Sequence, residues 1–144
     1  MKIRNFTPHD LEKVLEFRKK SAVISFPDSK PDMKTIKKSI LETYKKDKEA
    51  IKVVEENGKV IAHIILKIKK TSMNTYGMID YIFVDEMHRG RGIATKLMKL
   101  AEEYFRKKGI RKLRATITLT NTPSLKMSKK LGYKEKRVIM EKDI

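Results

Sequence analysis

The chain has 144 residues, of which 40% are apolar, which is enough for one hydrophobic core and is typical of a single domain spanning residues 1–144. It has no cysteine, which excludes disulfides and thiol catalysis, and we expect a cytoplasmic protein. The net charge of +17 is shared nearly equally by the two halves of the chain, so there is no basic tail of the kind that binds nucleic acid. The overall positive charge still attracts polyanions.

The sequence does not favour a membrane protein or a metalloprotein. No stretch reaches the roughly 18 apolar residues that a membrane span needs, and the N-terminus lacks the apolar region of a signal peptide. The three histidines, His9, His63 and His88, are scattered without partners at the spacing of metal ligands. We therefore expect neither a membrane span nor a metal site.

The N-terminal third predicts one short strand and two helices. Lys2–Phe6 alternates as a strand does. A first helix is expected over Thr7–Lys20, because Thr7 suits the cap and proline follows it, and Phe17 or Arg18 continues its buried stripe. After a loop rich in proline and aspartate, apolar residues at helical spacing predict a second helix over Pro31–Lys46.

A β-hairpin is predicted next. Its arms, Ile51–Glu56 and Lys59–Lys69, flank Asn57-Gly58, a pair suited to a type I′ turn. The second arm is too apolar for an edge strand, so we expect it in the middle of the sheet. His63 within it is interpreted as a packed or solvent-facing residue and not as a catalytic base.

The stretch from residue 79 to residue 109 combines a strand, a glycine turn and a helix. The strand Tyr76–Val84 leads into the basic turn Arg89–Gly92, and an amphipathic helix then runs to Gly109. Glycines let the backbone approach an anion, and the N–H groups and dipole of a helix N-terminus attract negative charge. The pattern predicts a phosphate-binding turn.

The C-terminal part predicts two more strands around a short helix. Arg111–Thr120 alternates, Thr122 begins a helix that stops at Gly132, and Glu135–Met140 is expected as a last strand. Together the elements predict an α/β fold with a twisted mixed sheet of about six to seven strands flanked by about four helices.

At the basic turn the chain resembles the acetyl-CoA signature of the GNAT superfamily of N-acetyltransferases. Arg89, Gly92 and Ala94 fill that signature, and Asn121 followed by Leu131-Gly132-Tyr133 matches a second landmark of the family. The resemblance extends over essentially the whole chain. It implies a GNAT-like fold that is split between the strands Tyr76–Val84 and Arg111–Thr120.

The resemblance also implies where acetyl-CoA, or CoA, is held. The pantetheine arm is expected along the β-strand backbone at the split, with the short helix on the other side of the arm. The pyrophosphate is expected at the glycine turn. The implied contacts are Ile82, Phe83, Val84, Arg89, Gly90, Arg91, Gly92, Ile93, Ala94, Thr95, Asn121, Ser124 and Ser128.

The catalytic groups are less well defined. Asp80 is the candidate general base, because period two places it on the face of Ile82 and Val84. An equally weighted interpretation makes Asp80 a surface or salt-bridged strand residue. Many relatives have a tyrosine that protonates the thiolate seven residues after the asparagine, where this chain has Ser128, so the acid is not assigned.

The resemblance implies an N-acetyltransferase in which a primary amine attacks acetyl-CoA directly within a ternary complex. The acceptor is expected to be a small-molecule amine, a peptide N-terminus or a lysine. The loop at about Ser21–Asp32 is expected to shape the acceptor site. Whether the protein forms a homodimer is left open. Two alternatives remain: a module that binds acetyl-CoA with little transfer, which Ser128 favours, and a basic nucleic-acid-binding domain, which the dispersed charge disfavours.

Overall fold

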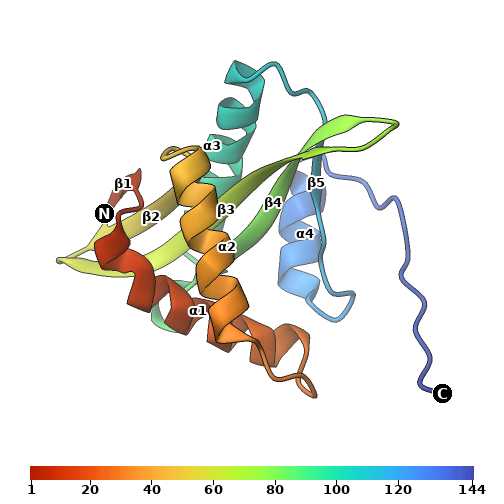
Figure 1. The fold of residues 1–144 in the computed structure, drawn as a ribbon, viewed down its shortest axis with the longest axis horizontal. Helices are drawn as coiled ribbons and strands as arrows, with labels where there is room; N and C mark the ends of the chain where they lie inside the picture. Colours follow the sequence, from red (N-terminus) through yellow and green to blue (C-terminus); the bar gives the residue numbers. More distant parts are fainter.

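The computed structural model describes residues 1–144 and contains one five-stranded sheet whose strands follow in the order β1-β2-β3-β4-β5 (Figure 1). Neighbouring strands are antiparallel, except that β4 and β5 are parallel. The predicted mixed α/β fold class is confirmed. The strands are β1 (Lys2–Asn5), β2 (Ile51–Glu56), β3 (Lys59–Lys70), β4 (Thr75–Val84) and β5 (Leu113–Ala115).

Four α-helices cover the two faces of the sheet, α1 and α2 on one face and α3 and α4 on the other (Figure 1). None of them combines the length and the apolar character that crossing a membrane requires. Two short 3-10 turns, η1 and η2, complete the order of elements. The helices are η1 (Pro8–Asp10), α1 (Leu11–Ser25), α2 (Met33–Lys46), η2 (Glu86–His88), α3 (Ile93–Lys107) and α4 (Thr122–Lys130).

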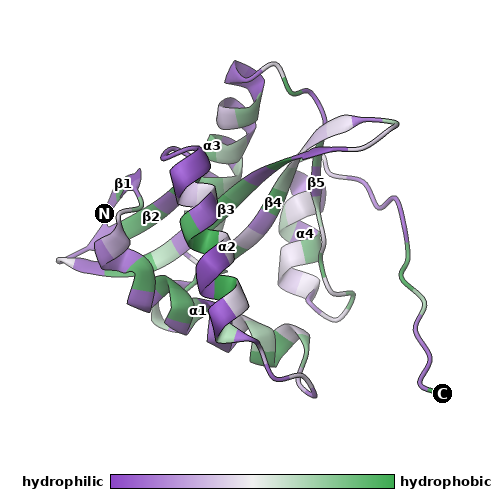
Figure 2. Cartoon of the chain, viewed as in Figure 1, coloured by the Kyte–Doolittle hydropathy of each residue, from purple (hydrophilic) through white to green (hydrophobic).

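The core lies on both sides of β3, whose residues 61–66 are all buried in the middle of the sheet (Figure 2). A cluster of twelve buried residues fills the side of α3, and a smaller cluster lies under α1 and α2. α3 packs directly on β4 at Gly77, where an added Cβ would lie 2.6 Å from the ring of Phe105. This contact fixes α3, and with it the turn that precedes α3, against β4.

The predicted hairpin is confirmed. Asn57 and Gly58 have φ values of 52° and 74°, as a type I′ turn requires, and β3 pairs with strands on both sides. His63 on β3 is fully buried and its ring stacks on Phe17, with ring centroids 5.9 Å apart. Burial lowers the pKa of His63 to about 3, so it is a neutral packing residue.

Three boundaries differ from the sequence predictions. The strand expected over Arg111–Thr120 contains only Leu113–Ala115, because β4 offers β5 no partner beyond Ile79. Residues 133–144 form no regular structure, so the strand expected over Glu135–Met140 is absent and the count is five strands instead of six or seven. The aliphatic residues of this tail, Val138, Ile139, Met140 and Ile144, have no neighbouring strand and lie exposed. The first helix continues five residues past Lys20, since proline comes only at residue 27.

Candidate active site

Strands β4 and β5 separate halfway along β4. Their parallel ladder runs from Gly77 opposite Leu113 to Ile79 opposite Ala115, and there β5 ends. β4 continues to Val84, so its edge over residues 80–84 has no neighbouring strand on that side. This is the split that the resemblance to the GNAT superfamily implied. Free N–H and C=O groups along such an edge can pair with an extended ligand as a strand would.

A β-bulge at Asp80 marks the beginning of the split. Ile65 of β3 pairs with Tyr81 and Leu66 pairs with Ile79, so Asp80 has no partner in the register. The extra residue changes which side chains face each helix layer. Asp80 contacts Lys67, which reaches α2, and Tyr81 packs with the cluster under α1 and α2.

Asp80 does not lie on the face that the period of the strand predicted. Ile82 and Val84 pack against the cluster on the side of α3, opposite to Asp80. Counting in steps of two fails across a bulge, because two successive residues then oppose one residue of the partner strand. Asp80 therefore lies on the α1–α2 face of the sheet, where the split begins.

Asp80 forms an ion pair in this position. Its Oδ2 lies 3.2 Å from Nζ of Lys67, and Lys67 also donates to the hydroxyl of Ser39 on α2 at 2.9 Å. The ion pair proposed as the alternative for Asp80 is thus present. The carboxylate side chain keeps 17% of its surface exposed, so the ion pair does not bury it completely.

The turn before α3 contains a run of unused backbone donors. Gly90 and Gly92 have φ values of 77° and 76°, a region that favours glycine. The N–H groups of residues 90–95 donate to no backbone or side-chain acceptor, and Gly92 caps α3 without a side chain. Six successive free donors at the positive end of a helix dipole make an anion-binding site.

The two arginines of this turn point to different partners. Arg89 is exposed, and its Nε–H donates to the carbonyl of Val84 at 3.0 Å, which brings the guanidinium across the end of β4. Arg91 forms a two-pronged ion pair with Glu56 of the hairpin, with N···O distances of 2.9 and 2.7 Å. That pair lowers the pKa of Glu56 to about 2. Arg89 is therefore the guanidinium available to an anion at the turn.

On the far side of the split, polar residues of α4 are present, but none of them is a suitable general acid for the thiolate. Asn121 caps the helix, and its Oδ1 accepts the N–H of Ser124 at 3.4 Å. Ser128 is 4% exposed and its hydroxyl has no partner. The hydroxyl of Tyr133 is also buried without a partner, and burial raises its pKa to about 12. Tyr133 packs against the core cluster beside α3, so it occupies a packing position.

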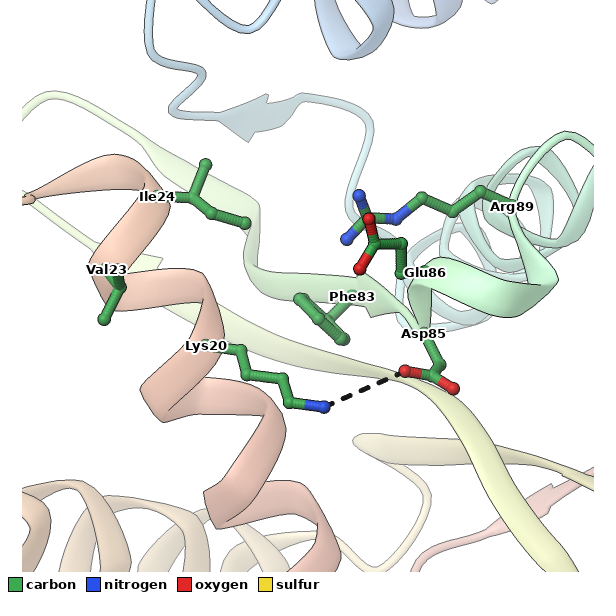
Figure 3. Close-up of a pocket in the computed structure, with 7 residues that line it drawn as sticks. All are labelled: Lys20, Val23, Ile24, Phe83, Asp85, Glu86 and Arg89. Atoms are coloured by element: carbon green, nitrogen blue, oxygen red, sulfur yellow. Dashed lines mark ion pairs between the residues drawn. The ribbon is translucent and has the colours of Figure 1, made fainter.

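A pocket of about 390 Å³ opens between the second half of α1 and the end of β4 (Figure 3). Nζ of Lys20 and Oδ1 of Asp85 lie 4.0 Å apart across it. Asp32, in the loop expected to shape the acceptor site, instead caps α2. The residues that line the pocket are Lys20, Val23, Ile24, Phe83, Asp85, Glu86 and Arg89.

Two residues at the split, Arg18 and Lys67, are absent from the predicted site. Helical spacing predicted Arg18 only as a continuation of the buried stripe of the first helix, and no pattern pointed to Lys67. A charged residue at a core-facing position of a helix, four residues after Val14, was the available signal for Arg18. No local signal places Lys67 beside Asp80, because that contact depends on the bulge.

Comparison with known sequences identifies the family. The sequence profile of the Acetyltransferase (GNAT) family matches residues 11–133. The chain belongs to the GNAT acetyltransferase family. An uncharacterized N-acetyltransferase of Methanocaldococcus jannaschii is 34% identical over 98 residues, which cover 66% of this chain and 43% of that protein. The chain thus spans less than half the length of that relative.

Solved structures share the GNAT fold. A predicted acetyltransferase from Clostridium acetobutylicum, crystallised with acetyl-CoA, has 18% identity and a TM-score of 0.80 over 99% of this chain and 95% of that one. The aminoglycoside 6′-N-acetyltransferase AAC(6′)-Ig from Acinetobacter haemolyticus has 23% identity and a TM-score of 0.74 over 100% and 99% of the two chains. At these identities the likeness concerns the fold.

Proposed function

We propose that residues 1–144 form one acetyltransferase domain that moves the acetyl group of acetyl-CoA to a primary amine. The observation that carries this proposal is the run of six free N–H groups over residues 90–95, next to the unpaired edge of β4. The first feature suits a pyrophosphate and the second suits an extended, amide-containing arm. The structural relative from Clostridium acetobutylicum, which holds acetyl-CoA, supports the same ligand.

In this proposal each predicted contact has a role. The N–H groups of the turn and the guanidinium of Arg89 bind the pyrophosphate, while the backbone at Ile82, Phe83 and Val84 pairs with the pantetheine arm. Asn121, Ser124 and Ser128 border the arm from α4. Arg91 contributes its backbone N–H, since its side chain is held by Glu56.

The transfer itself needs one base and a properly placed amine. The amine nitrogen attacks the thioester carbonyl carbon, an N–C bond forms, the C–S bond breaks, and CoA leaves as a thiolate. Asp80 takes the proton that the amine loses, and water protonates the thiolate, because Ser128 stands where many relatives have a tyrosine. Without cysteine, no thiol carries the acetyl group.

A second candidate function is a module that binds acetyl-CoA without rapid transfer. The observation that favours it is Ser128, which stands where many relatives have a tyrosine and whose buried hydroxyl has no partner. This candidate keeps the cofactor site and predicts little release of CoA.

One experiment separates the two candidates. Thermal unfolding is followed with and without acetyl-CoA, and free CoA is measured with polyamines, aminoglycosides, amino acids and peptides as acceptors. A raised Tm together with amine-dependent CoA release supports the transferase. A raised Tm without CoA release across the panel favours the binding module. If Tm is unchanged and no CoA is released, both candidate functions are overturned.

The base role of Asp80 is tested by Asp80→Asn. We expect kcat/KM to fall by about 10² to 10³, because an amide cannot take the proton that the amine loses. Lys67→Gln breaks the same ion pair but keeps the carboxylate, so it is the matched control and keeps most of the activity. Equal losses in both variants would assign Asp80 to the ion pair and remove it from catalysis.

A further inference from the structure

Arg18 is a buried cation that the proposed reaction does not yet use. It lies on the sheet-facing side of α1 with 6% of its surface exposed, its Nε–H has no hydrogen-bond partner, and no ion pair within the chain involves its guanidinium. Its Cζ lies 3.2 Å from the centroid of the Tyr81 ring. A stacked ring compensates part of the cost of burying the charge, but it supplies no opposite charge to the guanidinium.

The groups around Arg18 do not neutralise it. Asp80 is the nearest carboxylate on β4, and it is already paired with Lys67. His63 on β3, packed on the same side of the sheet, is fully buried and neutral, with its pKa lowered to about 3. Two cations therefore face one carboxylate, and this part of the site carries an excess positive charge.

This excess charge lies at the place where chemistry is proposed. Tyr81 follows the bulge residue Asp80, and both belong to the part of β4 that lies beyond the ladder with β5. Arg18 therefore flanks the beginning of the split on the α1–α2 face. An acceptor whose amine reaches Asp80 would bring its remaining groups next to this guanidinium.

The chemistry of the guanidinium selects among acceptors. Its planar fork matches a carboxylate, with two parallel N–H···O bonds. A polyamine or an aminoglycoside would instead bring further cations beside Arg18 and Lys67, where low solvent exposure strengthens the repulsion. The site thus favours a compact amine that carries its own negative charge.

We propose that the acceptor is an amine that also carries a carboxylate, such as an amino acid, and that Arg18 binds that carboxylate. This inference rests on the proposed acetyltransferase function. It makes Arg18 a residue that determines acceptor specificity, while acetyl-CoA is held by the turn before α3.

The test compares matched acceptors that differ only in the carboxylate. L-Ornithine is paired with putrescine, L-lysine with cadaverine, and L-phenylalanine with phenethylamine, and CoA release is measured at fixed acetyl-CoA. In the preferred pair, we expect kcat/KM to be at least about tenfold higher for the amino acid than for the matching amine. A charge-assisted hydrogen bond between Arg18 and the carboxylate accounts for a factor of this size.

Two variants assign this preference to Arg18. Arg18→Gln should raise KM for the preferred amino acid at least about tenfold with little change in kcat, and leave the matching amine unaffected. Lys19→Gln changes the neighbouring exposed cation on the same helix and should leave both acceptors unaffected. Binding of the acid and of the amine to the CoA-loaded protein, measured by calorimetry, gives the same comparison without turnover.

The outcomes separate this inference from the proposed function. No Tm shift with acetyl-CoA and no CoA release would overturn the proposed function and the inference together. Acetyl-CoA binding with equal use or equal binding of acids and amines would overturn the inference alone. The same conclusion follows if Arg18→Gln weakens both members of a pair equally, since a structural role predicts that result.

Discussion

Helices α2 and α3 begin in opposite ways. At α2, the carboxylate of Asp32 accepts the N–H groups of Lys34 and Thr35 at 3.1 and 3.2 Å. At α3, Gly92 has no side chain and six N–H groups over residues 90–95 have no acceptor. Every helix start has donors that the helix cannot satisfy. α2 satisfies two of them within the chain through Asp32, and we propose that α3 leaves its donors for a phosphate ligand.

α4 lies between these two cases. Asn121 caps it, but the single accepted bond to Ser124 is long at 3.4 Å. A neutral amide also leaves its own N–H₂ group free to donate. The helix next to the proposed pantetheine arm is thus capped weakly, by a residue that can contact both the helix and a ligand.

The largest effect on acetyl-CoA binding is expected when an acidic residue is placed at the start of α3. Gly92→Asp adds a side chain at a φ of 76° and a carboxylate beside the free N–H groups. It should weaken acetyl-CoA binding about 100-fold or more, measured by calorimetry, because the carboxylate occupies the anion site and repels phosphate.

Gly109→Asp is the matched control for this variant. Gly109 has a φ of 72° and no atom near an added Cβ, and it follows the opposite end of the same helix. Backbone strain and added charge are therefore comparable, while the anion site is untouched. Equal loss of affinity in both variants would contradict the proposed phosphate site.

A smaller effect is expected at α4. Asn121→Ala removes both the weak cap and the amide that borders the pantetheine arm. Loss of one hydrogen bond to a ligand corresponds to about a fivefold weaker Kd for acetyl-CoA. Calorimetry of the variant checks this, and a Tm change in the free protein with unchanged Kd would mean that Asn121 serves only as a cap.

The start of α2 should respond in stability but not in binding. Asp32→Ala removes the acceptor of two N–H groups and should lower Tm by about 2–4 °C, while the Kd for acetyl-CoA stays the same. Hydrogen bonds from Thr35, through its hydroxyl and its N–H, lower the pKa of Asp32 below its usual value. Stabilisation by this carboxylate is therefore present above pH 3.8 and lost as the pH falls through the lowered pKa.

The difference in Tm between wild type and Asp32→Ala should accordingly disappear in strong acid. Thermal unfolding at neutral pH and below the lowered pKa measures it. A difference that persists unchanged at the lowest pH would show that Asp32 acts by packing and not as a charged cap.

The smallest effect on binding is expected at Arg91. Its guanidinium is bound to Glu56, so Arg91→Gln should change the Kd for acetyl-CoA by less than about threefold. In the same variant the pKa of Glu56, followed by NMR, should rise from about 2 toward its ordinary value of 4.5. A large loss of affinity would mean that Arg91 leaves Glu56 and binds the ligand.

The features that the sequence predicts well depend on neighbouring residues. The turn at Asn57-Gly58 follows from the backbone preferences of that pair, and the glycine turn before α3 carries its own signature. The fold class follows because these local signals fix the order of strands and helices.

The features that the sequence does not predict depend on contacts between distant residues. The bulge at Asp80 arises from the register between β3 and β4, and the short β5 from the point where β4 loses its partner. Arg18 lies against Tyr81 only because α1 packs on that face of the sheet. Residue spacing along one strand or helix does not contain this information.

The most direct test of the proposed acetyl-CoA site follows individual backbone N–H groups by NMR in ¹⁵N-labelled protein. Adding acetyl-CoA should shift the amide resonances of residues 90–95 and of Ile82–Val84, and leave those of Lys34 and Thr35 at the capped start of α2 unchanged. Saturable binding with unshifted resonances at residues 90–95 would contradict the proposed site.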